Sequence, residues 1–122
     1  MMEQVKEVRI VAATVFDLID RKVLHVGAIG IVGRGGYSDG RLEPRVYITP
    51  PDDGTWDFDM VAAPPAEVAI QVETPIGASF SGVAADWLKC VRVHAAQNAL
   101  VQEVIVMLNA APDSGGGSAD TA

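Results

Sequence analysis

Residues 45–60 read RVYITPPDDGTWDFDM and hold the clearest structural signal in the chain. Two runs of alternating side chains flank the turn-forming stretch 50–54, which is the pattern of a β-hairpin. Pairing Thr49 with Thr55 places two apolar pairs on one face and two polar pairs on the other. The apolar pairs are Val46 with Phe58 and Ile48 with Trp56, and the polar pairs are Arg45 with Asp59 and Tyr47 with Asp57. In this register Trp56 and Phe58 face the core and Asp57 faces water, so a lysine is predicted to cost more stability at Trp56 than at Asp57.

The N-terminal third shows a second strand pair. Residues 8–19 are apolar on both faces for part of their length, as in a strand covered on both sides. A polar turn at 20–22 leads to residues 23–32, which read as the partner strand. The glycines of that second strand indicate either a close backbone approach or a bulge.

The remaining segments are shorter. Residues 67–74 and 87–95 alternate apolar and polar side chains, as half-buried strands do. Residues 98–108 combine helical spacing with β-branched side chains, and we favour a final strand over a helix there. Residues 33–45 and 75–86 are rich in small and turn-forming side chains and are predicted to be loops that could carry a binding site.

These patterns predict a mainly β fold, a single-domain antiparallel β-sandwich or flattened barrel of about seven to eight strands over residues 1–111. The alternative packs residues 98–108 across the sheet as one C-terminal helix. Residues 112–122 are mostly Gly, Ser, Ala and Asp. Without an apolar anchor they cannot offset the entropy of ordering, so a flexible tail is expected.

Charge and cysteine content limit the partners. Sixteen acidic and nine basic residues give a formal charge of −7, and no Lys/Arg run exceeds Arg21-Lys22. This balance disfavours nucleic acid and anionic membrane surfaces as partners, because both need a clustered positive face.

Cys90 is the single cysteine, so no internal disulfide can form, and a cytoplasmic location is expected. The start of the sequence lacks the order of a secretory signal, and its apolar runs are too short to span a bilayer.

Two clusters have the composition of ligand sites without their spacing. The glycines of residues 27–36 are not followed by a helix pattern, which a phosphate-binding loop requires. Asp52, Asp53, Asp57 and Asp59 do not match a calcium loop, and turn and surface positions account for them better. No cofactor and no metal site are predicted.

The histidines carry the enzyme hypothesis. His25 and His94 are the side chains able to act as a base near neutral pH without a perturbed environment. If a three-residue turn joins Ile19 to Val23, Asp17 lies opposite His25 and could orient its imidazole. A structural histidine explains the same geometry, and the G-x-S-x-G nucleophile elbow is absent from the sequence.

The sequence thus contains no catalytic signature. We expect a non-enzymatic binding or assembly module that forms a homo-oligomer and recognises a protein or small-molecule ligand through its two long loops. The candidate binding side chains on or beside these loops are Arg34, Tyr37, Arg41, Phe80 and Trp87. The alternative is a small enzyme that uses a His–carboxylate pair, drawn from His25, His94, Asp17, Asp57 and Asp59, in a pocket between sheets.

Overall fold

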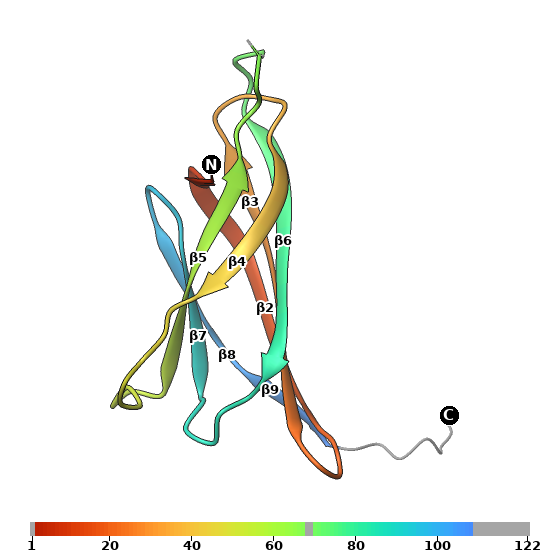
Figure 1. Ribbon diagram of the computed structural model, residues 1–122, viewed down its shortest axis with the longest axis vertical. Helices are drawn as coiled ribbons and strands as arrows, with labels where there is room; N and C mark the ends of the chain where they lie inside the picture. The colour runs from red at the N-terminus through yellow and green to blue at the C-terminus, as the bar shows by residue number, and fades with distance from the viewer. Residues whose placement is uncertain (1, 68–69, 109–122) are drawn as a thin grey trace, which may run out of the picture.

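The computed structural model describes residues 2–67 and 70–108, and within these ranges the chain forms β-strands and no helix (Figure 1). The predicted mainly β fold is confirmed. None of the described residues belongs to a helix long and apolar enough to cross a membrane. The tail expected at 112–122 lies outside the described residues. The strands are β1 (Glu3–Gln4), β2 (Glu7–Asp17), β3 (Lys22–Val32), β4 (Ser38–Pro44), β5 (Thr55–Ala63), β6 (Thr74–Val83), β7 (Cys90–His94), β8 (Ala99–Glu103) and β9 (Ile105–Leu108).

The strands form two sheets packed against each other in a sandwich-like arrangement that does not close into a barrel. Sheet A has the order β1-β5-β7-β8, with β4 also paired to β5, and sheet B has the order β6-β3-β2-β9. The β5–β7 and β2–β9 pairs are parallel. Both sheets are therefore mixed, whereas the short alternating segments of the sequence indicated purely antiparallel ones. Parallel neighbours need long crossovers, which leave no local signal in the sequence.

The strand pair predicted over residues 8–32 is confirmed by β2 and β3. Asp17 pairs with Lys22, and the ladder shifts register between Val8 and Ile10. At this end of the pair, a Cβ on Gly30 would lie 2.6 Å from the carbonyl oxygen of Glu7. The glycine-rich strand thus has both features predicted for it, a close backbone approach and a neighbouring bulge.

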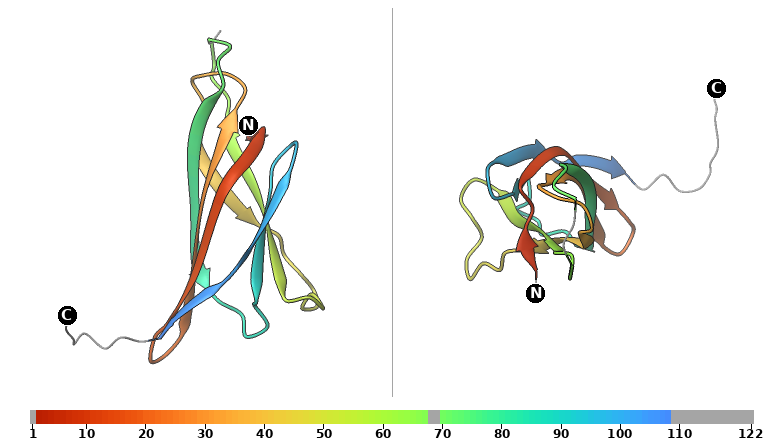
Figure 2. Two further views of the ribbon diagram at one scale, coloured as in Figure 1. Left: turned by 180° about the vertical axis from the view of Figure 1, so that it is seen from behind. Right: turned by 90° about the horizontal axis from the view of Figure 1, so that it is seen from above.

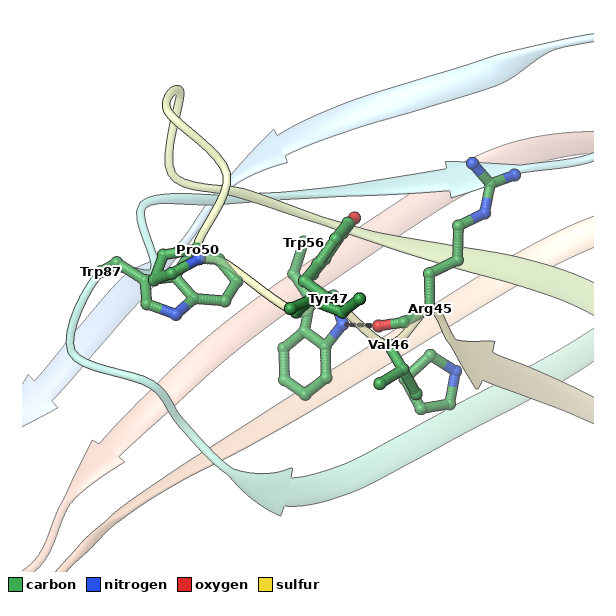
Figure 3. A pocket seen from close by; sticks show the side chains of 8 residues that line it. Arg45, Val46, Tyr47, Pro50, Trp56 and Trp87 are labelled. Carbon is green, nitrogen blue, oxygen red and sulfur yellow. Dashed lines mark hydrogen bonds between the residues drawn. The ribbon is translucent and has the colours of Figure 1, made fainter.

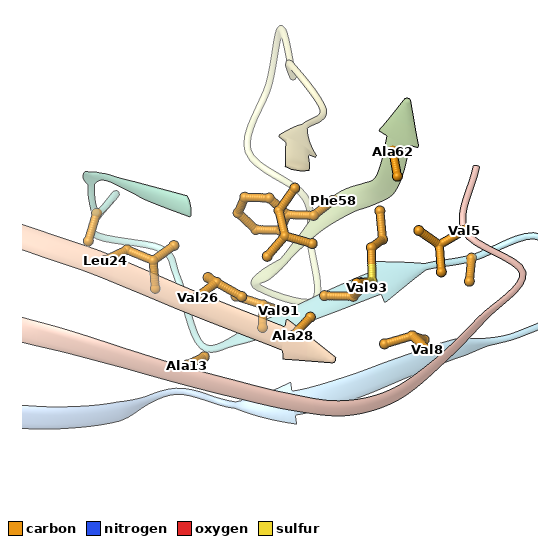
Figure 4. Packing of buried hydrophobic residues seen from close by; sticks show 14 of the residues in the cluster. Val5, Val8, Ala13, Leu24, Val26, Ala28, Phe58, Ala62, Val91 and Val93 are labelled. Atoms are coloured by element: carbon orange, nitrogen blue, oxygen red, sulfur yellow. The ribbon is translucent and has the colours of Figure 1, made fainter. Parts of the chain in front are cut away.

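Alternate side chains of both sheets meet in one hydrophobic core (Figure 4). Trp56, Phe58 and Phe80 pack together at one end of it, with ring centroids 5.0 to 5.7 Å apart. The rest is aliphatic, as the low aromatic content of the sequence requires. The largest fully buried side chains are Phe58, Leu24, Met60, Val5, Val8, Val26, Val91 and Val93.

The register predicted for residues 45–60 is wrong by two residues. Pro44, not Val46, pairs with Phe58, and β4 ends there. Val46 and Ile48 are 93% and 103% exposed instead of packing on the aromatic side chains of β5. A slip of two residues leaves every side chain on its own face of the sheet, so alternation alone cannot distinguish the two registers.

The loop predictions for residues 33–45 and 75–86 are wrong over most of their lengths, because β4 and β6 occupy these ranges. Residues 70–73 of the predicted strand 67–74 are irregular, and Ile70 and Val72 are exposed. The small side chains of β6 serve close packing: a Cβ on Gly40 of β4 would lie 2.3 Å from the carbonyl oxygen of Gly77. Glycine there permits β4 and β6 to approach, and it does not mark a loop.

The last segment is extended, so the strand favoured over a helix for residues 98–108 is confirmed. The chain pairs with β7 as far as Glu103, crosses at Val104 and pairs with β2 from Ile105 (Figure 2). One continuous stretch therefore serves both sheets. The Val104 amide donates to the Lys89 carbonyl (3.0 Å) at the crossing point.

Candidate functional site

Among the polar side chains on the outer face of sheet A, that of Asp57 makes the most hydrogen bonds. Its carboxylate accepts hydrogen bonds from Arg92 Nε (2.6 Å) and His94 Nε2 (2.7 Å) at Oδ1, and from the Tyr47 hydroxyl (2.5 Å) at Oδ2. The residue is 7% exposed. The prediction that Asp57 lies on a wet face is therefore wrong: it faces away from the core, but residues 45–49 fold over it.

These contacts determine the charge of the cluster. Burial raises the pKa of Asp57, but the hydrogen bonds from Arg92, Tyr47 and His94 outweigh it and hold the pKa far below its usual value. The guanidinium of Arg45 likewise lowers the pKa of Asp59, which it contacts at 2.9 Å. Both carboxylates remain ionised and paired near neutral pH.

The expected pairs Arg45–Asp59 and Tyr47–Asp57 therefore exist as side-chain contacts even though the strand register behind them was wrong. Arg45 donates its amide to the Asp57 carbonyl (2.9 Å), after which the chain leaves the ladder. Its side chain and that of Tyr47 then reach back to β5. The polar contacts hold residues 45–49 against the sheet without strand pairing.

The histidines divide between the two sheets. His25 on β3 pairs with Thr14, and Asp17 pairs with Lys22, so the expected Asp17–His25 pair does not form. The turn between β2 and β3 lies at residues 18–21 instead of 20–22, so Thr14 takes the place opposite His25. His25 is exposed, with Nδ1 2.8 Å from Ser81 Oγ.

His94 does meet a carboxylate, that of Asp57 (2.7 Å), and this carboxylate has further partners. Arg92 and Tyr47 share the same carboxylate, which makes the group a structural hub. Neither His94 nor Asp57 lines the pocket described next or three further hollows of similar size. A general base needs a substrate-sized space beside its free nitrogen.

An aromatic pocket shares Tyr47 with this hub (Figure 3). The ring centroid of Trp87 lies 6.2 Å from those of both Tyr47 and Trp56, in edge-on geometry. The hollow has a volume of about 370 Å³, within the usual size range of ligand pockets. We call this hollow the aromatic pocket. It is lined by Pro44, Arg45, Val46, Tyr47, Ile48, Pro50, Trp56 and Trp87.

Backbone contacts hold the aromatic pocket in shape. Trp56 donates its indole N–H to the Arg45 carbonyl (2.8 Å), which fixes the ring against residues 45–48. Gly54 has φ +69°, and its carbonyl accepts from the amides of Lys89 (2.8 Å) and Cys90 (3.1 Å). A Cβ on Gly54 would lie 2.9 Å from the Trp87 carbonyl oxygen. Glycine is required at this turn both for its φ and for the close approach of the Trp87 segment.

The polar groups of the aromatic pocket are mostly occupied. Arg45 is paired with Asp59, and the Tyr47 hydroxyl with Asp57. The indole N–H of Trp87 has no hydrogen-bond partner within residues 2–67 and 70–108. The lining of the pocket is thus mainly apolar, and Trp87 contributes an unpaired side-chain donor to it.

The five predicted binding residues do not converge. Arg34 lies over the ring of Tyr37, 5.2 Å from its centroid, and the Tyr37 hydroxyl donates to Glu3 (2.5 Å). Arg41 pairs with Asp39, and Phe80 packs against the core. Trp87 alone lines the aromatic pocket.

The predictions missed the other walls of the pocket. Tyr47 was placed on a wet strand face, and Trp56 only in the core. The excess of proline and aromatic residues in 44–56 was visible in the sequence. However, the signal that would have shown the pocket is the departure of residues 45–49 from β5, and strand alternation hides it.

No group of three or more His, Cys, Asp or Glu side chains that could hold a metal ion occurs in the part of the chain that the structure describes. Searches against family models, curated proteins and solved structures found no match for this chain.

Proposed function

We propose that this chain is a non-enzymatic binding module whose ligand site is the aromatic pocket. The observation that carries the proposal is the grouping of both tryptophans of the sequence with Tyr47 around a hollow of about 370 Å³. Half-exposed aromatic side chains with a large contact area and few rotamers are typical of recognition surfaces. Val46 and Ile48, which are almost fully exposed on its rim, add apolar area that a ligand would cover.

The ligand we infer is a small, mainly apolar, ring-bearing molecule or side chain with one hydrogen-bond acceptor. The pocket volume suits a group of this size, and its paired Arg45 leaves little net charge to attract an ion. The acceptor would meet the unpaired indole N–H of Trp87. An apolar ligand without an acceptor would leave this donor unsatisfied and bind less well.

Both tryptophans line the pocket, so they also report on it. In a ¹⁵N-labelled sample each indole N–H gives its own NMR signal, and we expect ring-bearing fragments with a carbonyl to shift the Trp87 signal more than that of Trp56. Trp87→Leu removes one of the two signals and should abolish the ligand-induced shift of the other, that of Trp56. Ile70→Ser, at an exposed apolar residue elsewhere, is the matched control. A fragment library that leaves both indole signals unmoved at millimolar concentration would refute the ligand site.

The alternative function, a small enzyme with a His–carboxylate pair, retains one supporting contact, between His94 and Asp57. Nδ1 of His94 has no hydrogen-bond partner among the described residues, so it could accept a proton. Two observations weigh against it: Arg92 and Tyr47 share the carboxylate, and His94 lines none of the four hollows described above. If His94 only supports the fold, we expect His94→Gln to change the stability while ligand binding at Trp87 persists.

The proposal includes two properties of the whole molecule. A chain with a single cysteine, half-exposed Cys90, suits the reducing cytoplasm. Its partners would be the pocket ligand and a second copy of itself, because sheet B carries exposed apolar side chains that a homo-oligomer would cover.

A further inference from the structure

The outer face of sheet B is uncharged over four consecutive rows of cross-strand neighbours. The first two rows are Ile10, Ile29 and Gly77, then Ala12, Gly27 and Ser79; the next two are Thr14, His25, Ser81 and Ile105, then Phe16, Val23, Val83 and Met107. Their alternates Val15, Leu24 and Val26 are buried, so these side chains face away from the core. Here they are called the apolar face.

Exposure on the apolar face is high for large apolar side chains. Val83 is 70% exposed, Ile105 60% and Ile10 57%. Single exposed residues of this kind are ordinary, but a contiguous set across four strands is not. Because β-strands lie about 4.8 Å apart and rise about 3.3 Å per residue, the four rows, two across three strands and two across four, cover about 440 Å² in projection.

Charge distinguishes this face from the other side of the molecule. The outer face of sheet A carries Glu43, Asp57, Asp59, Arg92 and His94, whereas the sole titratable side chain on the apolar face is His25. The chain as a whole has a charge of −7. Two copies could therefore bring their apolar faces together without burying an unpaired carboxylate, which no other combination of sheet faces allows.

The two ends of the apolar face differ in the size of their side chains. One end is hollow: a depression of about 460 Å³ is lined there by Ile10, Ala12, Gly27 and Gly77, among others. The other end carries the larger side chains Phe16, Val23, Val83 and Met107, here called the ridge. A two-fold rotation about an axis near the row of His25 would set the ridge of each copy over the hollow of the other, as an isologous interface requires.

We propose that two copies of this chain associate through their apolar faces into a symmetric dimer, with His25 and Ser81 near the two-fold axis. This inference rests on the homo-oligomer part of the proposed function and is independent of the aromatic pocket. About 440 Å² per copy gives about 900 Å² in all, in the range of weak and transient protein interfaces. The expected dimer is therefore reversible, with a micromolar dissociation constant.

Sedimentation equilibrium of the full chain over a wide concentration range tests the dimer. The expected mass rises from that of one chain, 12.8 kDa, to twice that value. Val83→Lys places a charge on the ridge at a side chain already 70% exposed. It should raise the dissociation constant at least about tenfold, since each copy would bury an unpaired ammonium.

A second variant acts on the hollow. A Cβ on Gly27 would meet no atom within 4 Å, so Gly27→Leu fills the hollow without a clash inside the monomer. It should weaken the dimer as Val83→Lys does while leaving the unfolding midpoint of the monomer unchanged or higher. The matched control is Ile70→Lys, at a residue that is 75% exposed and belongs neither to the apolar face nor to the aromatic pocket.

Each result is decisive. A chain that stays monomeric at all concentrations, or a dimer equally stable in Val83→Lys and Gly27→Leu, overturns the proposal. Binding of fragments in the aromatic pocket, measured on the Val83→Lys monomer by the Trp87 indole signal, separates the two hypotheses. If the fragments bind and no dimer forms, the dimer is refuted and the pocket is retained, and the reverse result refutes the pocket alone.

Discussion

Tyr47 makes two hydrogen bonds to Asp57: its hydroxyl donates to the carboxylate (2.5 Å) and accepts from the amide of the same residue (3.0 Å). The Tyr47 hydroxyl thus accepts from the Asp57 amide in the way that a backbone carbonyl of a neighbouring strand would. One side chain from an irregular segment therefore completes the outer edge of β5. The same ring forms a wall of the aromatic pocket, which couples the stability of the hub to the shape of the pocket.

Tyr47→Phe removes both bonds, and we expect it to lower the free energy of unfolding by about 1–3 kcal/mol, since a buried amide loses its acceptor. Urea denaturation at neutral pH measures this loss. Tyr37→Phe is the matched control, because Tyr37 also donates to a carboxylate at 2.5 Å but satisfies no backbone amide. Equal losses in the two variants would show that the amide of Asp57 does not depend on Tyr47.

Asp57→Asn should lower the stability at neutral pH by about 3 kcal/mol, because it leaves Arg92 and His94 without a buried anion. The pKa of Asp57 is depressed in the folded chain, so its ionised form stabilises the fold. That contribution is complete above the unfolded-state pKa of about 3.9 and is lost as the pH falls from there toward the folded-state pKa.

Unfolding midpoints from pH 7 down to the acid transition test this linkage. The stability of the natural chain should fall more steeply below about pH 4 than that of Asp57→Asn, because the variant has no carboxylate to protonate. Asp20→Asn, at an exposed turn side chain, should follow the natural chain throughout. Parallel curves for Asp57→Asn and the natural chain would contradict the role given to the carboxylate.

Phe58→Ala should cost about 3–5 kcal/mol, because it opens a cavity among side chains that are fully buried. Ile48→Ala should change the stability by less than about 0.5 kcal/mol, since surface substitutions without partners do so. In the hairpin register expected from alternation, Ile48 would have packed opposite Trp56, and removing its side chain would lower the free energy of unfolding. Chemical denaturation of the two variants therefore discriminates between the registers.

The glycines of β3 offer a matched pair. A Cβ on Gly30 would lie 2.6 Å from the Glu7 carbonyl oxygen and 2.9 Å from a methyl group of Val5, whereas one on Gly27 meets nothing within 4 Å. Gly30→Ala should cost about 1–3 kcal/mol through overpacking. Gly27→Ala should be neutral or stabilise by up to about 1 kcal/mol, because it reduces the entropy of the unfolded chain. Thermal unfolding of both variants checks the difference, and equal midpoints would contradict the bulge geometry of β2.

Local patterns in the sequence correctly predicted the mainly β fold, the strand pair formed by β2 and β3, and the extended form of the last segment. In these stretches local alternation and β-branched side chains agree with the tertiary structure, and a shift by one residue would expose the core. The sequence also placed Arg45, Tyr47, Asp57 and Asp59 on one face, because the expected and actual registers differ by an even number of residues.

Other features of the fold could not be predicted from the alternation of apolar and polar side chains. The two-residue shift of β4, the parallel pairing of β7 with β5 and the burial of Asp57 all depend on contacts between residues distant in sequence. The same holds for the aromatic pocket, where Trp87 meets Trp56 across a crossover. Strand periodicity states which face a side chain occupies but carries no information on the partner strand, so neither the pocket nor the apolar face could be located before the sheets were assembled.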